Sequence, residues 1–195
     1  MRPPAARRTG PMAVFEARYR ADADPWGTLT EPYELEKRRR TLAACGPGPF
    51  ASACELGAGL GALAAELAPR CGRLIALDAA PTAVAAAAER LAPFAHAEAR
   101  LAVMPHDLPV DERFDLIVAS EVLYYLDAAA LAATAAWAAR ALVTGGRLVA
   151  VGWIGEAPDM PGDAEGVVAA LARELRSVAT QADPGYRIDV LERAA

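Results

Sequence analysis

The sequence has few of the side chains that most enzyme chemistries require. Its 195 residues include two histidines, three cysteines and one lysine, against 19 arginines. Cys45, Cys54 and Cys71 match no C-x-x-C or zinc-finger pattern, and the two histidines lie too far apart for a shared metal at the usual spacing. No metal site is therefore expected. A serine hydrolase is also disfavoured, because no G-x-S-x-G elbow occurs.

Basic charge and long apolar runs are scarce as well. The formal net charge is −5, and no basic stripe persists along the chain, so a nucleic-acid partner is not expected. The first 20 residues contain no apolar segment typical of a signal peptide. The longest apolar runs are rich in alanine and are interrupted by Glu89, Arg90 and Arg140, which excludes a membrane span. Together with the odd number of cysteines, these absences predict a cytoplasmic location.

Helical and strand-like patterns alternate along most of the chain. We expect a flexible tail over 1–11 and a single domain over 12–195, with an N-terminal helical lid over 12–46 and a core over 50–195. The predicted helices cover 12–19, 31–45, 60–68, 81–91, 128–142 and 163–175, and the predicted strands cover 50–56, 73–77, 99–104, 114–119, 147–154, 177–181 and 186–192. This alternation predicts an α/β fold, a Rossmann-like doubly wound three-layer sandwich. Its mostly parallel seven-stranded sheet would carry an antiparallel C-terminal strand.

A glycine-rich turn follows the first predicted strand. The segment Glu55-Leu-Gly57-Ala-Gly59-Leu-Gly61 leads into a helix, which is the context of a nucleotide-binding turn. Glycines there permit positive φ and let a ligand approach the backbone. The spacing is G-x-G-x-G, so the third glycine comes one position earlier than in the dinucleotide pattern G-x-G-x-x-G. The turn therefore fits a pyrophosphate poorly.

Three acidic residues accompany this turn. Glu55 precedes Gly57 by two positions, Asp78 ends the second strand, and Asp107 follows the third. A carboxylate at the tip of the second strand is placed to accept both hydroxyls of a ribose, and Asp107 could accept from an exocyclic amine. With three acids and no lysine for a phosphate, a cationic ligand carrying a ribose and an adenine fits better than NAD.

These motifs resemble the cofactor motifs of the class I methyltransferases that use S-adenosylmethionine. The resemblance covers roughly residues 50–155. It implies that Glu55 and the glycine loop hold the methionyl part, that Asp78 holds the ribose, and that Asp107 with neighbouring backbone holds the adenine. The expected cofactor-binding residues are Glu55, Gly57, Gly59, Gly61, Asp78, Ala79, Asp107, Leu108 and Ser120, together with Trp26, Tyr33 and Lys37.

A more specific resemblance extends over nearly the whole chain. The segments Asp24-Pro-Trp26, Tyr33-Glu-Leu-Glu-Lys37, Phe114–Leu126 and Tyr186–Glu192 are similar to those of the NodS-like methyltransferases. That resemblance implies N-methylation of a free amine, as on a de-acetylated chitooligosaccharide. The expected partner is thus a small-molecule or oligosaccharide acceptor. Because relatives of this family could act on other amines or on hydroxyls, these acceptors stay as alternatives.

Glu121 and Tyr124 are the expected catalytic residues. Glu121 follows the fourth predicted strand, and ligands of open α/β sheets bind beyond the carboxyl ends of strands. It would orient an incoming amine or accept its proton, although an acid at a helix N-terminus is also favoured by the helix dipole. Methyl transfer is an in-line displacement, for which alignment supplies much of the rate.

Two residues near the N-terminus have open assignments. Lys37, which shares a helix face with Tyr33, could bind the cofactor carboxylate or a substrate oxygen, or it could form a salt bridge to Glu34. Trp26 could cover the cofactor or pack the N-terminal helix onto the core.

The sequence thus predicts an S-adenosylmethionine-dependent methyltransferase acting on an amine of a small molecule or saccharide. An O-methyltransferase acting on a natural-product hydroxyl is one alternative. A methyltransferase-like module that binds nucleosides without turnover is another, and an NAD-binding domain is a third.

Overall fold

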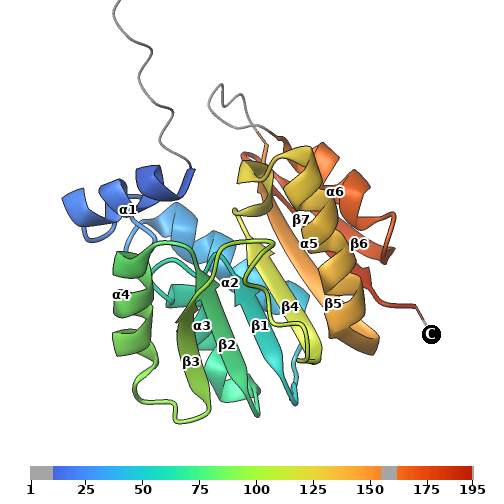
Figure 1. The fold of residues 1–195 in the computed structure, drawn as a ribbon, viewed down its shortest axis with the longest axis horizontal. Coiled ribbons are helices and arrows are strands. Elements are labelled where there is room, and N and C mark those ends of the chain that lie inside the picture. The colour runs from blue at the N-terminus through green and yellow to red at the C-terminus, as the bar shows by residue number, and fades with distance from the viewer. Residues whose placement is uncertain (1–10, 155–161, 195) are drawn as a thin grey trace, which may run out of the picture.

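Seven strands form a single twisted sheet in the computed structural model, which describes residues 11–154 and 162–194 (Figure 1). The strands are β1 (Ala53–Leu56), β2 (Leu74–Asp78), β3 (Ala97–Leu101), β4 (Phe114–Ser120), β5 (Leu142–Trp153), β6 (Arg176–Asp183) and β7 (Tyr186–Glu192). Their order is β3-β2-β1-β4-β5-β7-β6. Strands β1 to β5 pair in parallel, whereas β7 runs antiparallel to both β5 and β6. The predicted fold class is confirmed.

Helices cover both faces of this sheet. They are α1 (Pro11–Ala21), α2 (Pro32–Cys45), α3 (Ala62–Leu67), α4 (Pro81–Leu91), α5 (Ala128–Ala141) and α6 (Ala164–Leu171), with the 3₁₀ turns η1 (Ala68–Arg70) and η2 (Leu123–Tyr125). One apolar core packs α2 and α3 on the sheet, and the other packs α5 and α6 on the opposite face. In Figure 1, α1 lies beside α4, away from α5 and α6.

The helix α5 shows how this alanine-rich sequence builds a core. Asp127 caps its N-terminus by accepting a hydrogen bond from Ala130 N at 2.8 Å. Leu131, Ala135 and Ala138 recur at helical spacing and are buried against the sheet. Small alanine side chains let the helix approach the strands closely.

The strand order places a ligand crevice in the middle of the sheet. The chain runs outward from β1 to β3, then returns to β4, which lies on the other side of β1. The loops that follow β1 and β4 therefore diverge above the same edge. Ligands of open α/β sheets bind at such a switch point.

Several predicted boundaries differ from the structure. The first strand begins at Ala53 rather than residue 50, and Phe50 forms only an isolated bridge to Cys71. The helix predicted from 60 begins at Ala62, because Gly61 before it adopts φ +74°, outside the helical region. The strand predicted over 99–104 instead spans Ala97–Leu101.

Differences also occur towards the C-terminus. Helix α6 ends at Leu171 rather than at residue 175, since turns over residues 172–174 separate it from β6. Strand β5 begins at Leu142, directly after α5, and includes the Gly145-Gly146 pair that the sequence placed before it. Of the predicted tail, Pro11 begins α1, while residues 1–10 lie outside the described residues, as do positions 155–161 of the predicted glycine-rich loop.

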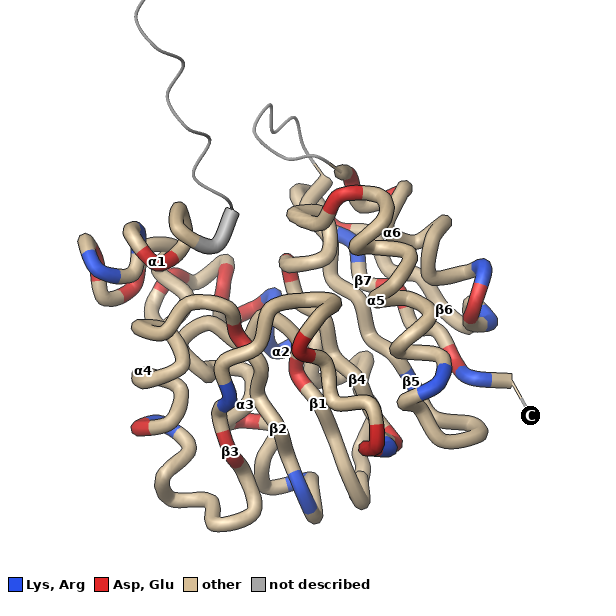
Figure 2. The backbone as a smooth tube through the Cα atoms, viewed as in Figure 1, with Lys and Arg blue, Asp and Glu red and all other residues tan. Residues whose placement is uncertain are grey.

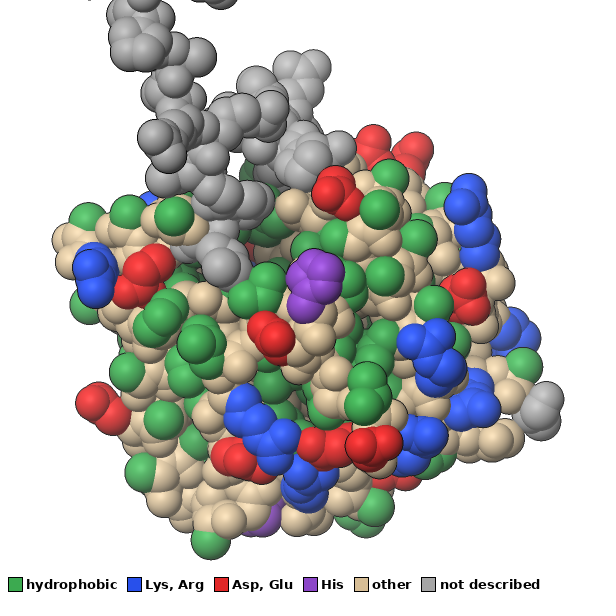
Figure 3. Space-filling view, in the orientation of Figure 1, with side chains coloured by type: hydrophobic (Ala, Val, Ile, Leu, Met, Phe, Trp, Pro, Cys, Tyr) green, Lys and Arg blue, Asp and Glu red, His purple; other side chains and the backbone are tan. Residues whose placement is uncertain are grey.

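Acidic and basic residues are interspersed along the backbone of the fold (Figure 2). Figure 3 shows them alternating in a band across one face. Over β2 and β3, Arg73 and Arg100 both pair with Glu112, and Arg100 also pairs with Glu98 at 2.5 Å. Such partly exposed pairs each contribute little to stability.

Two further features of the described residues concern membrane-spanning helices and metal ligands. None of their helices is long and apolar enough to cross a membrane. Within those same residues, no three histidine, cysteine, aspartate or glutamate side chains are grouped so as to hold a metal ion. The three cysteines are free thiols buried in the core.

Candidate active site

A cavity of about 490 Å³ lies at the crevice that the strand order predicts. Its walls come from the loop after β1, the ends of β2 and β4, the segment after β3, and the helices α1 and α2. This volume is typical of a small-molecule site. The lining includes five carboxylates, those of Glu34, Glu55, Asp78, Glu121 and Asp127, and two permanent cations, Lys37 and Arg38.

Two glycines of the loop after β1 stand where a side chain would not fit. Gly57 has φ +69°, and a Cβ atom added to it would lie 2.6 Å from the Cβ of Val122. Gly61 has φ +74°, and its added Cβ would lie 3.0 Å from Cα of Ala87. Other residues rarely adopt this backbone region. The glycines thus keep the loop compressed between its neighbours, with its backbone facing the cavity.

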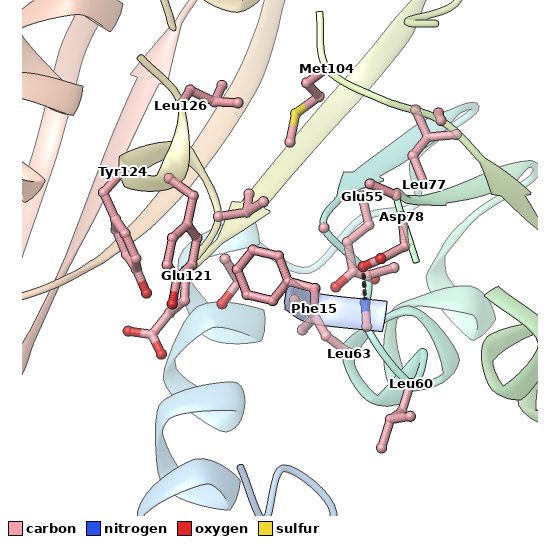
Figure 4. A pocket seen from close by; sticks show the side chains of 18 of the residues that line it. Phe15, Glu55, Leu60, Leu63, Leu77, Asp78, Met104, Glu121, Tyr124 and Leu126 are labelled. Carbon is pink, nitrogen blue, oxygen red and sulfur yellow. Dashed lines mark hydrogen bonds between the residues drawn. The ribbon is translucent and has the colours of Figure 1, made fainter. Parts of the chain in front are cut away.

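Asp78 is held in place at the end of β2 by two backbone amides. Its Oδ2 accepts a hydrogen bond from Gly59 N at 2.8 Å (Figure 4), and its Oδ1 accepts one from Ala80 N at 2.9 Å. Burial raises the pKa of Asp78, and the backbone amides oppose that rise. Each carboxylate oxygen can accept a second hydrogen bond, so Asp78 keeps capacity for two ligand hydroxyls.

Glu55 is a buried acid whose charge has little compensation. Its side chain is 2 % exposed, and Oε2 has no hydrogen-bond partner among the described residues. Burial, followed by the nearby charge of Asp78, raises the pKa of Glu55 to about 8. An unpartnered buried carboxylate is costly. A ligand cation placed beside Glu55 and Asp78 would remove that cost.

Glu121 lies on the other side of the cavity, directly after β4. Figure 4 shows it beside Tyr124, across the cavity from Glu55 and Asp78. It is the one non-glycine residue with positive φ in the described ranges, at +55°. Its Oε2 accepts a hydrogen bond from Lys37 Nζ at 2.5 Å, while its buried Oε1 has no partner among these residues. Strained backbone of this kind is found preferentially at functional sites.

Aromatic side chains from α1, from the loop before α2 and from η2 line the cavity. The ring centroids of Phe15 and Tyr125 lie 4.8 Å apart, edge to face. Those of Tyr19 and Trp26 lie 5.2 Å apart, and those of Tyr124 and Tyr125 lie 4.6 Å apart. Burial raises the pKa of the Tyr124 phenol, and the charge of Glu121 adds to that rise. Tyr124 therefore stays protonated and able to donate a hydrogen bond.

The structure brings most of the predicted residues together at this cavity. Those that line it are Trp26, Lys37, Glu55, Gly57, Gly59, Asp78, Ala79, Ser120, Glu121 and Tyr124. Lys37 forms the salt bridge to Glu34, at 2.8 Å, that was one of its open alternatives, and it also pairs with Glu121, which the sequence did not indicate.

Four predicted residues lie outside the cavity wall. Gly61 packs closely against Ala87 at the end of the loop, and Leu108 is buried in the apolar core. Asp107 instead closes a turn, where its Oδ2 accepts a hydrogen bond from Val103 N at 3.0 Å. Tyr33 is 41 % exposed and packs edge to face on Tyr186.

Other wall residues were not singled out from the sequence. Phe15 and Tyr19 reach the cavity from α1, and Met104 and His106 reach it from the segment after β3. The helical spacing of Phe15 and Tyr19 is visible in the sequence, but it indicates only a helix with one apolar face. Nothing local shows that this face covers a cavity.

A doubly wound sheet with a G-x-G-x-G turn after β1 and an acid at the end of β2 defines the Rossmann-like fold of the class I methyltransferases. The family model for Nodulation protein S (NodS) matches residues 14–152. The chain belongs to the NodS family.

Similar proteins agree with this membership. Nodulation protein S of Sinorhizobium fredii is 35% identical over 116 residues, covering 59% of this chain and 53% of that protein. Nodulation protein S of Rhizobium tropici is 36% identical over 128 residues, covering 65% of this chain and 53% of that protein. The chain thus spans about half the length of the curated relatives it matches.

A solved structure resembles the whole fold. The N-methyltransferase NodS from Bradyrhizobium japonicum WM9, in complex with S-adenosyl-L-homocysteine, superposes with a TM-score of 0.84 at 27% identity. The match covers 94% of this chain and 98% of that one.

Proposed function

We propose that this chain is an S-adenosylmethionine-dependent N-methyltransferase that acts on an amine of a small molecule or saccharide. The observation that carries the proposal is a cavity with a buried carboxylate oxygen on each side, from Glu55 and from Glu121, that has no partner among the described residues. Membership of the NodS family supports the class of reaction. The similarity to an N-methyltransferase in complex with S-adenosyl-L-homocysteine supports the cofactor.

The side with the glycine-rich loop fits the cofactor. The cofactor's amino group would meet Glu55, whose buried Oε2 has no partner in the described residues. Asp78, already oriented by Gly59 and Ala80, would accept the ribose hydroxyls. Leu60 and Met104 offer apolar surface beside them for a flat base. A pyrophosphate in the same place would meet two carboxylates, which disfavours NAD.

The side with Glu121 fits the acceptor. S-adenosylmethionine supplies a methyl group activated by a sulfonium, so the protein mainly has to align the attacking atom. Oε1 of Glu121 would accept a hydrogen bond from the amine and direct its lone pair toward the methyl group. Tyr124 would donate a hydrogen bond to a neighbouring oxygen of the acceptor, because its phenol stays protonated. The aromatic wall excludes water from the aligned pair.

A matched set of acceptors tests this function. A chitooligosaccharide de-acetylated at one sugar carries a free amine, and its fully acetylated counterpart differs only at that nitrogen. We expect mass spectrometry to show one added methyl group on the de-acetylated compound and none on the acetylated one, with release of S-adenosylhomocysteine. Simple amines and phenols complete the panel. Methylation of hydroxyls alone would establish an O-methyltransferase, and cofactor binding without any turnover would establish a binding module.

We also propose that the protein acts in the cytoplasm, since three buried free thiols suit a reducing compartment. Fractionation of the source cells tests this location, and enrichment outside the cytoplasm would contradict it.

A further inference from the structure

Lys37, the single lysine of the chain, is buried. It is 5% exposed, and its ammonium meets two carboxylates: Glu34 Oε1 at 2.8 Å and Glu121 Oε2 at 2.5 Å. A lysine is rarely buried unless it is paired. Glu34 lies one helical turn away on α2, whereas Glu121 directly follows β4. The ion pair between Lys37 and Glu121 therefore links α2 to the acceptor side of the cavity.

This pairing leaves Glu121 with two unequal oxygens. Oε2 is engaged by Lys37, and Oε1 is buried with no partner in the described residues. The backbone of Glu121 is in the left-handed region, at φ +55°, and this conformation sets the direction in which the side chain leaves the backbone. A carboxylate held at one oxygen keeps the other as a hydrogen-bond acceptor, and Glu121 is one of the residues that line the cavity.

Among the described residues, the groups that face Glu121 include one cation. Lys37, Glu34 and Tyr33 face it from α2, and Tyr124 and Tyr125 face it from η2. Burial raises the pKa of Glu121 and the charge of Glu34 adds to the rise, while Lys37 alone among them lowers it. Lys37 therefore favours the ionised form of Glu121 in surroundings that favour its neutral form.

We propose that Lys37 is a positioning residue for acceptor binding: it holds one oxygen of Glu121 and maintains the carboxylate, so that the other oxygen receives an N–H of the acceptor amine. This inference rests on the proposed function and deepens it. It defines the acceptor as a primary or secondary amine that offers an N–H to Glu121 while its lone pair faces the methyl group. It also separates Lys37 from cofactor binding.

Variants at Lys37 test the assignment. Lys37→Met keeps the length of the side chain and removes its charge, and Lys37→Arg restores the charge. For Lys37→Met we expect an increase in the KM for the amine of at least about tenfold at pH 7, and a shift of the acid limb of the kcat/KM profile to higher pH. The Kd for S-adenosylhomocysteine, measured by calorimetry, should stay unchanged. Lys37→Arg should recover most of the KM.

Two further variants provide the controls. Arg39→Met removes a cation from the same helix whose ion pair, among the described residues, is with Glu36 alone, and it should change none of these quantities. Glu34→Gln removes the charge that raises the Glu121 pKa, so it should shift the acid limb to lower pH. This opposite shift can be measured even if Lys37→Met does not fold.

Three results would overturn the assignment. Loss of S-adenosylhomocysteine affinity in Lys37→Met would make Lys37 a cofactor ligand. A higher KM with an unshifted pH profile would make it a packing residue only. An unmoved profile in Glu34→Gln would also contradict it. If the wild-type protein methylates no amine, the proposed function fails and this inference fails with it. If the wild-type protein does methylate amines, these variant results bear on Lys37 alone.

Discussion

Glu55 and Glu121 each bury a carboxylate oxygen without a partner among the described residues, on opposite sides of one cavity. Such groups are rare in folded proteins because an unmade buried hydrogen bond is costly. A bound cation beside Glu55 and a bound N–H donor beside Glu121 would satisfy both. At the scale of single residues, the site is thus complementary to the ligands that we propose for it.

Glu55 should make the stability of the free protein depend on pH. Its pKa of about 8 in the folded state exceeds the ordinary glutamate value of 4.5, so folding favours the protonated form. The stabilisation is fully present below pH 4.5 and is lost as pH rises through 8. At about 1.4 kcal/mol per pKa unit, the free energy of unfolding should fall by several kcal/mol relative to Glu55→Gln. Urea unfolding of both proteins between pH 5 and 9 measures the difference.

The same series with saturating S-adenosylhomocysteine provides the control. A bound amino group should hold Glu55 ionised and flatten the difference between the two proteins. Parallel pH dependence of wild type and Glu55→Gln without ligand would show that Glu55 does not have the raised pKa.

Replacement of Asp78 should weaken cofactor binding. Asp78→Ala removes an oriented carboxylate, and hydrogen bonds to charged groups contribute about 1.5–3 kcal/mol each. We therefore expect calorimetry to give a Kd for S-adenosylhomocysteine at least about tenfold higher. The control is Asp115→Ala, because Asp115 also accepts a backbone hydrogen bond, from Ser52 N, but lies outside the cavity wall. Equal affinity in wild type and Asp78→Ala would remove Asp78 from the site.

Only part of the residue-scale site could be predicted from the sequence. Glu55, Gly57 and Asp78 follow from a local motif, since each lies at a strand end in a fixed order along the chain. The ion pair between Lys37 and Glu121 joins residues 84 positions apart. Such a contact depends on how α2 packs against the sheet, and no local pattern encodes it.

At the scale of elements, the loop between β1 and α3 links the fold to the site. Its glycines place backbone where side chains would collide with Val122 and Ala87. The Gly59 amide orients Asp78 in turn. The loop therefore connects the two strand ends that hold the predicted cofactor residues.

Gly57→Ala should damage both stability and binding. The added methyl group would lie 2.6 Å from Val122 at a positive φ, so the loop must move. The matched control is Gly145→Ala, which has a similar φ of +74° but open space around the added Cβ. Gly145→Ala should cost only the backbone penalty, about 1–2 kcal/mol, and leave cofactor affinity unchanged. Thermal unfolding and calorimetry compare the two, and equal effects would show that close packing at Gly57 is unimportant.

The elements themselves were largely predictable, while their ends were not. Alternating apolar strands and helices predict the sheet and its layers, because each element must bury one face. The start of α3 depends on the left-handed backbone of Gly61, and the end of α6 depends on turns after Leu171. These features are set by packing around the termini, which the hydrophobic period does not report.

At the scale of the whole molecule, the sheet order explains why one cavity gathers residues from so many segments. The crevice between β1 and β4 receives Glu55 and Asp78 on one side and Glu121 on the other, and α1 and α2 close it with aromatic rings and Lys37. The helical lid expected over 12–46 stays a prediction. Both N-terminal helices contribute to the cavity wall.

Ligand binding should stabilise the whole fold selectively. A ligand that binds only the folded state at one hundred times its Kd adds about 2.7 kcal/mol. S-adenosylhomocysteine should therefore raise the melting temperature by several degrees, whereas NAD at the same concentration should leave it unchanged. A larger shift with NAD would contradict the choice of cofactor.

The central claim is that one side of the cavity binds the adenosyl cofactor and the other binds the amine. The most direct measurement is a crystal structure of the protein with S-adenosylhomocysteine. We predict the ligand's amino group beside Glu55, its ribose hydroxyls on Asp78, and its sulfur facing Glu121. A ligand bound elsewhere, or with its sulfur turned away from Glu121, would contradict the account.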